Sequence, residues 1–466
     1  MKRLQNTCTN YLPFIFLAAI VFFPGITPYA YAEVPDAPPN IVIIMADDMG
    51  FSDLGCYGSE IQTPHIDGLA ANGLRFTNFY NGARCCPTRA ALLTGLYAHQ
   101  AGMGGMVSSK PKAADPGPYQ GYLDAQTVTL AEVLKSRGYS AFMSGKWHVA
   151  EEHPNWPMDR GFDDYYGLIS GAAHYFDIRR TKAPGLTRHF ARGNEEYLPT
   201  GENWYMTDAL TDSAVKMIQK FADKPNPFFL YLAYTAPHWP LHALPEDIAK
   251  YRGRYLKGWD VLRQERYQRQ NEMNLFDRNF ALSPRDSIVP AWESLDPDKQ
   301  DEMDLKMAVY AAQIECMDRG IGRVLDQLRQ SERFDQTLII FLSDNGACAE
   351  GGVFGQDFWG DSAPPGGPEG YHNYGLAWAN ASNTPFRKYK QYTHEGGIST
   401  PFIVSWPAVI REKGKITHQP GHIIDIMATV CDISGATYPQ TYRGNKIKPT
   451  EGKSLRPYFS ADSQIN

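Results

Sequence analysis

Five short apolar segments, each flanked by a cluster of polar residues, constrain the fold of this sequence more than any other feature. The first, 40–45, has the sequence NIVIIM and is followed by an Asp pair, and a later one, 337–342, has the sequence TLIIFL and is followed by Ser-Asp-Asn-Gly. The other three segments are 139–143, 228–234 and 400–406. Continuous apolar runs of this length are typical of strands that are buried on both faces of a parallel sheet.

Helical patterns lie between these strands. A capping box formed by Thr129 and Glu132 begins a helix over 130–136. The other expected helices are 209–221, with Thr207 and Asp208 as its cap, and 303–329. Strands that alternate with helices predict an α/β fold, with a large, mostly parallel central sheet flanked by helices.

Polar side chains at the carboxyl ends of the strands are expected to share one site, because such groups converge on the ligand crevice of an α/β sheet. The side chains placed there are Asp47, Asp48, Lys146, His148, His238, Asp344 and Asn345. Three carboxylates held together without a partner would have raised pKa values, because their negative charges repel one another. A divalent cation bound between them would remove this repulsion. The all-oxygen set formed by the aspartates and Asn345 suits Ca²⁺ or Mg²⁺ better than Zn²⁺.

A candidate nucleophile lies in the segment 81–95, NGARCCPTRAALLTG. Pro87 suits the first turn of a helix, which would place Cys85 at the helix N-terminus. That position favours a thiolate, a phosphate or a sulfate. The H-C-x5-R pattern of a thiolate phosphatase does not occur in this segment.

These motifs resemble those of the type I sulfatases, a family of the alkaline phosphatase superfamily. Cys85, Pro87 and Arg89 begin a match to the family signature C-x-P-x-R-x-x-x-L-T-G. Further matches follow the family's order at 40–48, 63–70, 145–148, 159–163, 236–238, 343–346 and 390–397. The resemblance covers roughly 40–454 and is closest to bacterial arylsulfatases with a long insert, here about 251–296.

The resemblance implies an enzyme that hydrolyses sulfate esters to an alcohol or phenol and inorganic sulfate. It implies that Cys85 is oxidised to formylglycine by a formylglycine-generating enzyme, and that the hydrated aldehyde is the nucleophile. The implied calcium ligands are Asp47, Asp48, Asp344, Asn345 and an oxygen of the modified Cys85. Arg89 would hold the hydrate, and His148 would help to deprotonate its second hydroxyl. Lys146, His238 and Lys390 would bind the sulfate, with His238 protonating the leaving group.

The N-terminal residues 1–32 have the layout of a secretory signal, with a basic start, an apolar stretch over 12–23 and Ala-Tyr-Ala at its end. An apolar run this short is unsuited to a membrane span of ~20 residues. We therefore expect cleavage, export to the periplasm or the medium, and no stable membrane anchor. The catalytic domain is expected over 33–457, with a short tail at 458–466, and the family's small C-terminal antiparallel subdomain is expected to be largely absent.

Charge narrows the range of partners. The 466 residues include 45 Lys and Arg against 51 Asp and Glu, a formal net charge of −6 that disfavours nucleic acid as a partner. The expected partners are a sulfated small molecule or carbohydrate as substrate and the formylglycine-generating enzyme during maturation.

The sequence is also compatible with two functions other than sulfate ester hydrolysis. The first is a phosphonate or phosphate ester hydrolase of the same superfamily, since the same nucleophile and metal could attack phosphorus. The second is a non-catalytic anion-binding protein, in which Cys85 stays unmodified. A zinc hydrolase is disfavoured because the ligand set has no cluster of histidines.

Overall fold

The computed structural model describes residues 38–107, 117–201, 203–277, 280–360 and 363–459. The predicted signal, 1–32, and the final part of the predicted tail, 460–466, lie outside the described residues. In the part of the chain that the structure describes, none of the helices has the length and apolar character needed to cross a membrane.

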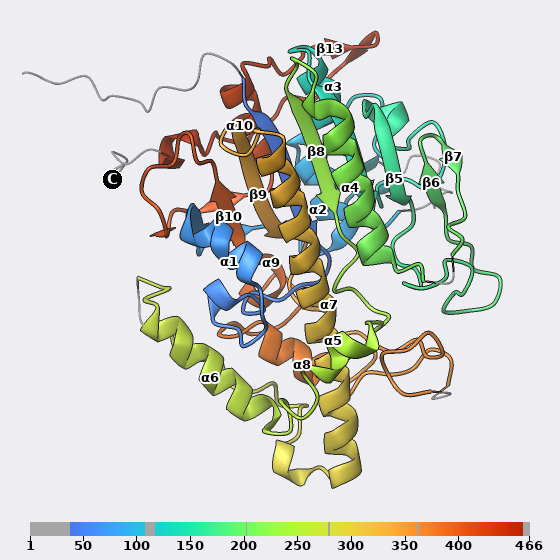
Figure 1. Cartoon of the computed structure of the whole chain (residues 1–466), viewed down its shortest axis with the longest axis vertical. Coiled ribbons are helices and arrows are strands. Elements are labelled where there is room, and N and C mark those ends of the chain that lie inside the picture. The colour runs from blue at the N-terminus through green and yellow to red at the C-terminus, as the bar shows by residue number, and fades with distance from the viewer. Residues whose placement is uncertain (1–37, 108–116, 202, 278–279, 361–362, 460–466) are drawn as a thin grey trace, which may run out of the picture.

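A ten-stranded sheet in the order β11-β2-β10-β9-β1-β8-β4-β5-β6-β7 forms the centre of the molecule (Figure 1). Its five middle strands are parallel: β9 (Thr337–Ser343), β1 (Asn40–Ala46), β8 (Phe228–Ala233), β4 (Ser140–Gly145) and β5 (Asp164–Leu168). The outer strands are β10 (Phe402–Ser405), β2 (Leu74–Phe76), β11 (Lys415–Thr417), β6 (Phe190–Arg192) and β7 (Glu195–Glu196). Antiparallel pairing begins at β10 on one side and at β6 on the other. The predicted α/β fold with a mostly parallel sheet is confirmed.

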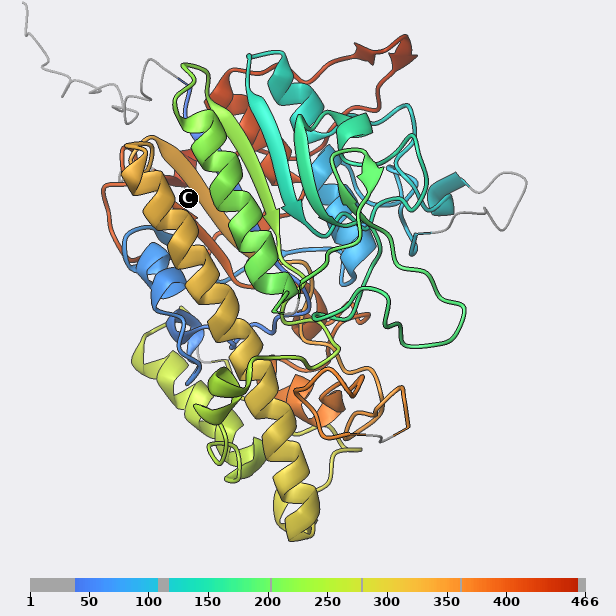
Figure 2. The ribbon, with the colours of Figure 1, turned by 45° about the vertical axis from the view of Figure 1, so that its right-hand side comes forward.

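Helices cover both faces of the sheet (Figure 2). One face packs against α7 (Pro297–Gln330), α4 (Met206–Ala222) and α1 (Pro64–Ala71), and the other against α2 (Cys85–Thr94), α3 (Leu130–Lys135) and α10 (Asp425–Ser434). The remaining elements are α5 (Pro245–Ala249), α6 (Gly258–Glu272), α8 (Gly375–Ser382), α9 (Glu395–Ile398), β3 (Phe79–Tyr80), β12 (Gly421–His422), β13 (Thr441–Tyr442) and β14 (Asn445–Lys446).

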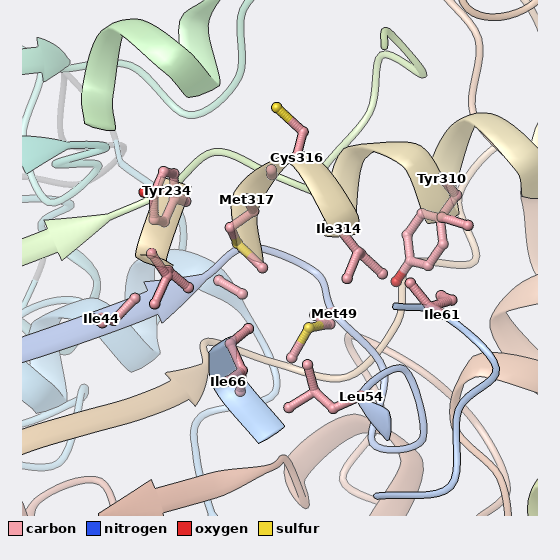
Figure 3. Packing of buried hydrophobic residues seen from close by; sticks show 14 of the residues in the cluster. Ile44, Met49, Leu54, Ile61, Ile66, Tyr234, Tyr310, Ile314, Cys316 and Met317 are labelled. Atoms are coloured by element: carbon pink, nitrogen blue, oxygen red, sulfur yellow. The ribbon is translucent and has the colours of Figure 1, made fainter. Parts of the chain in front are cut away.

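The continuous apolar sequence of β1 follows from this sandwich of helices. Ile44 lies in the core on the α7 face, whereas Ile43 lies in the core on the α2 face, and both side chains are fully buried. Figure 3 shows Met317 and Ile314 of α7 pointing toward Ile66 and Met49 in the first of these cores. In a strand that is buried on both faces, apolar and polar residues do not alternate, and the continuous apolar sequence therefore identifies β1 as such a strand.

Two helix boundaries differ from the sequence expectation. Thr207 and Asp208 were expected to cap α4, but the helix begins at Met206 and Tyr205 is its N-cap. Tyr205 and Met206 are buried, and the Met206 N–H donates to the carbonyl of Tyr175, so tertiary contacts begin the helix earlier than its polar residues indicate. Helix α7 also begins early, at Pro297, where the Asp296 side chain caps it.

Asp318 of α7 joins this helix to the start of α1. Its carboxylate accepts the backbone N–H groups of His65 and Ile66, at 3.1 and 2.8 Å. Burial raises the pKa of Asp318 to about 7, although these two hydrogen bonds lower it.

Stability is therefore expected to decrease as the pH rises through the titration of Asp318. The folded pKa of about 7 lies above the unfolded value of about 3.9. The contribution of the protonated Asp318 carboxyl to the unfolding free energy is thus complete below pH ~4 and is lost as the pH rises through ~7. We expect Asp318→Asn to flatten the pH dependence of the unfolding free energy in this window, by on the order of 3 kcal/mol or less, in urea denaturation. Identical slopes for the variant and the parent would contradict this assignment.

Candidate active site

Ten polar side chains from separate strands, loops and a helix meet at the carboxyl end of the parallel strands. They are Asp47, Asp48, Cys85, Arg89, Lys146, His148, His238, Asp344, Asn345 and Lys390. Each has 7% or less of its surface exposed. These ten are the site residues predicted from the sequence, and the hydrogen bonds, ion pairs and charge interactions described below bring them together.

Two buried ion pairs form the floor of the site. The Lys146 Nζ donates to Asp47 Oδ2 at 2.5 Å, and Arg89 donates to Asp344 Oδ2 through Nε at 3.1 Å and Nη2 at 2.8 Å. Arg89 Nη1 also donates to the carbonyl of Lys146, at 3.0 Å. Burial raises the pKa of Asp47 well above its usual range, and Asp344 raises it further, against the opposing charges of Lys146 and Arg89.

Asp48 joins the loops that follow β1 and β9. Its backbone has a φ of 65° and its N–H donates to Asp344 Oδ1 at 3.1 Å, while Asn345 Nδ2 donates to its Oδ1 at 2.6 Å. Its Oδ2 accepts from Lys390 Nζ at 2.8 Å and lies 3.3 Å from His238 Nε2. Burial alone would raise the pKa of Asp48, but the charge of Lys390, together with the neighbouring His238, outweighs it and lowers the pKa.

Two buried oxygens at this floor have no hydrogen-bond partner among the described residues. They are Asp47 Oδ1 and Asn345 Oδ1. A buried oxygen without a partner carries a desolvation penalty of about 1–3 kcal/mol, which a bound cation would remove. Together with Asp48 and Asp344 they make an all-oxygen donor set, so the residues present fit Ca²⁺ or Mg²⁺.

Cys85 is the first residue of α2, and the extended Arg84 is its N-cap. The thiols of Cys85 and Cys86 and a ring nitrogen of His148 lie within 4.8 Å of one another. A hydrogen bond with Cys86 lowers the pKa of Cys85 well below its usual range, and Lys146 contributes to the shift. Burial instead raises the pKa of Cys86. The six cysteines of the described residues are all free thiols.

Both histidines of the site are uncharged near neutral pH, because burial lowers the pKa of His148 and of His238 to about 4. His238 Nδ1 lies 2.6 Å from the carbonyl of Trp239, so the ring donates there and Nε2 faces Lys390 Nζ at 3.5 Å. His148 has a φ of 53° and packs against Gly171, where a Cβ would lie 2.3 Å from Nε2.

Contacts that the sequence did not reveal hold the loop after β1. Arg266 of α6 is fully buried and its Nη1 donates to Asp53 Oδ1 at 2.7 Å. Asp53 Oδ2 in turn accepts from the Gly50 N–H and from the Tyr310 hydroxyl, both at 2.8 Å. These residues come from distant parts of the chain, and no local motif signals their pairing.

Comparison with protein-family models finds a match to the sulfatase family over residues 39–436. An arylsulfatase of Klebsiella aerogenes is 33% identical over 428 residues, which cover 90% of this chain and 91% of that protein. An uncharacterized sulfatase of Schizosaccharomyces pombe is 35% identical and covers 90% of this chain and 79% of its own length. The human N-acetylgalactosamine-6-sulfatase is 30% identical, over 91% of this chain and 68% of its own.

Solved structures show the same architecture. The crystal structure of Ps i-CgsB in complex with k-i-k-neocarrahexaose matches with a TM-score of 0.63 and 27% identity, over 91% of this chain and 76% of that one. The phosphonate monoester hydrolase of Agrobacterium radiobacter, at 18% identity and a TM-score of 0.53, shares the fold.

Proposed function

Because the chain belongs to the sulfatase family and is therefore a sulfuric ester hydrolase, we propose that it cleaves sulfate esters with a formylglycine made from Cys85 and a bound calcium ion. The observation that carries this proposal is that α2 begins with Cys85 and, one turn later, places Arg89 against Asp344 and Asp47, beside the two buried oxygens that have no hydrogen bond among the described residues. The oxygens fit a hard cation, and the helix N-terminus fits an anion beside it.

The charges of the site support a dication and an anion together. Asp47, Asp48 and Asp344 face three cations, and these cations are Lys146, Arg89 and Lys390. The protein charges therefore cancel, so Ca²⁺ would give the site a net positive charge that suits a sulfate group. Asp47, Asp48, Asp344 and Asn345 would hold the ion, which would supply Lewis-acid stabilisation of negative charge.

The chain's own side chains would then orient the reaction. The hydrated aldehyde at position 85 would supply two hydroxyls, one to attack sulfur and the other to expel sulfate. Arg89, fixed by Asp344 and by the carbonyl of Lys146, would hold that hydrate in place. His148 lies beside the residue 85 side chain with its Nδ1 free of a hydrogen bond in the described structure, so it can accept the proton of the second hydroxyl.

Proton delivery to the leaving oxygen would fall to His238. Its Nδ1–H is donated to a carbonyl, so Nε2 carries the free lone pair. A proton taken up at Nε2 would pass to the alcohol or phenol, while Lys390, 3.5 Å away, would keep its charge for the sulfate. Lys146 and Lys390 would also stabilise negative charge on the sulfate oxygens.

Burial fixes the order of maturation. Cys85 has only 2% of its surface exposed, so a modifying enzyme cannot reach its thiol in the folded chain. A formylglycine-generating enzyme would therefore act on the segment around Cys85 before the domain folds. A sulfated aryl compound or carbohydrate is the proposed substrate, because the relatives include an arylsulfatase and an N-acetylgalactosamine-6-sulfatase, and a similar solved structure is a complex with a neocarrahexaose.

The substrate preference tests this proposal. We expect kcat/KM for 4-nitrophenyl sulfate to exceed that for a 4-nitrophenyl phosphonate monoester by at least ~100-fold, about 2.7 kcal/mol in transition-state stabilisation. The protein should be produced with a formylglycine-generating enzyme, and its Cys85 peptide checked by mass spectrometry. A reversed preference, with the modification confirmed, would establish the phosphonate or phosphate ester hydrolase instead.

A further inference from the structure

An aromatic wall formed by Trp239, Phe358, Trp359 and Tyr371 adjoins the active site. Its link to the chemistry is Trp239, which follows His238 in the chain and whose ring lies 4.8 Å from the His238 ring. The Trp239 ring packs 5.0 Å from Phe358 and 6.0 Å from Tyr371. The wall therefore extends from the residue proposed to protonate the leaving group to the partly exposed Phe358 and Trp359.

A lysine lies against this wall without an acidic partner. The Lys182 Nζ is 5.2 Å from the centre of the Trp239 ring and 5.3 Å from that of Phe358. Since the His238 ring lies 4.8 Å from the Trp239 ring, no more than about 10 Å separates Lys182 from it. Lys182 makes no ion pair within the described part of the chain, whereas its neighbour Arg180 pairs with Glu369 at 3.0 Å.

The loop that carries Lys182 is fixed in place. The indole Nε1 of Trp359 donates to the carbonyl of Thr181 at 2.9 Å, and the guanidinium of Arg180 lies 4.8 Å from the Trp359 ring. Contacts of Arg180 and Thr181 with Trp359 thus hold the loop just before Lys182, whose own charge has no acidic partner among the described residues.

The wall also holds a buried donor without a hydrogen bond. The Tyr371 hydroxyl is buried and has no hydrogen-bond partner among the described residues, while its ring lies 6.0 Å from that of Trp239. Burial raises the pKa of this hydroxyl to about 12, so it stays protonated and can donate. A buried donor without a partner is costly unless a ligand or water satisfies it, and this one matches an acceptor oxygen.

We propose that Lys182, with the Tyr371 hydroxyl, forms a subsite for a second anionic group, so that the enzyme prefers carbohydrates carrying a further sulfate or carboxylate beside the sulfate ester that reacts. This inference rests on the proposed function for the location of the reacting sulfate. The cations at the site floor pair with carboxylates and would bind that sulfate, whereas Lys182 has no ion pair among the described residues. Lys182 Nζ lies no more than about 10 Å from the His238 ring, across Trp239, so a second anion that the substrate carries on this side would meet it.

Binding to an inactive enzyme tests the subsite independently of turnover. In a Cys85→Ala background, we would measure by calorimetry the affinities of disaccharides with two sulfates, on the same ring or on neighbouring rings, and of their singly sulfated counterparts. We expect at least one doubly sulfated sugar to bind about tenfold tighter, and Lys182→Met to reduce that ratio about fivefold to tenfold. The preference should also weaken in high salt.

Lys224→Met is the matched control, because Lys224 also lies over an aromatic ring, 4.0 Å from the centre of Phe221, at the end of α4. It should leave the affinity ratio unchanged. The subsite is refuted if the parent does not discriminate between the sugars, if Lys182→Met leaves the ratio unchanged, or if it weakens both sugars equally. Failure of the proposed function has a different signature: the formylglycine-bearing enzyme would hydrolyse no sulfate ester.

Discussion

Replacing Cys85 with serine is expected to lower the turnover of an aryl sulfate by about 10⁴-fold or more, the scale on which removal of a covalent nucleophile acts. A serine has one hydroxyl, so it can displace the phenol but has no second hydroxyl with which to expel sulfate. We therefore expect a burst of at most one phenol per enzyme, followed by near-complete arrest, in rapid-mixing measurements with 4-nitrophenyl sulfate.

The neighbouring cysteine offers the control for this experiment. Cys86 is equally buried, but burial raises the pKa of its thiol, and no role in the chemistry is proposed for it. Cys86→Ser should therefore retain turnover within about threefold, and both variants should melt within a few degrees of the parent because the exchange is nearly isosteric. Full steady-state turnover by Cys85→Ser would exclude the proposed nucleophile.

Removal of divalent cations is expected to lower both activity and stability. Without an ion, Asp47 Oδ1 and Asn345 Oδ1 stay buried without a hydrogen bond from the described residues, and three carboxylates stay close together. Calcium at about 1,000 times its Kd would add about 4 kcal/mol to the unfolding free energy. We expect dialysis against EGTA to lower the Tm by several degrees and abolish turnover, and Ca²⁺ to restore both.

The variant Asp344→Asn separates the stability that comes from metal binding from the stability that comes from the protein's own ion pairs. Asp344 also pairs with the buried Arg89, so its loss should cost about 3–5 kcal/mol by itself. The informative quantity is therefore the difference in Tm with and without calcium, which should nearly vanish in the variant. Recovery of activity by Zn²⁺ and not by Ca²⁺ or Mg²⁺ would show that the ion is of a different kind.

Local sequence was sufficient to predict the floor of the site. The strands β1 and β9 were recognisable because both their faces are buried, and the acidic residues that follow them are adjacent in sequence to those strands. Parallel pairing of these strands, with Ala46 opposite Ser343, then brings Asp47 and Asp344 together.

Contacts between distant segments could not be predicted in the same way. The start of α4 depends on Tyr175, and the pairing of Arg266 with Asp53 joins residues 213 positions apart. The aromatic wall combines residues from the loops after β8 and β9 with a lysine from a third loop. Each of these arrangements follows from tertiary packing, which leaves no periodic or spaced signal in the sequence.

The central position of β1 has a consequence for the timing of maturation. Its neighbours in the sheet are β8 and β9, so the middle of the sheet cannot close before the chain has been synthesised past Thr337. About 250 residues separate that point from Cys85, and at 5–20 residues per second their synthesis takes roughly 10 to 50 s. The order of strands thus sets a minimum interval during which the thiol of a nascent chain stays open to a modifying enzyme, and faster translation would shorten it.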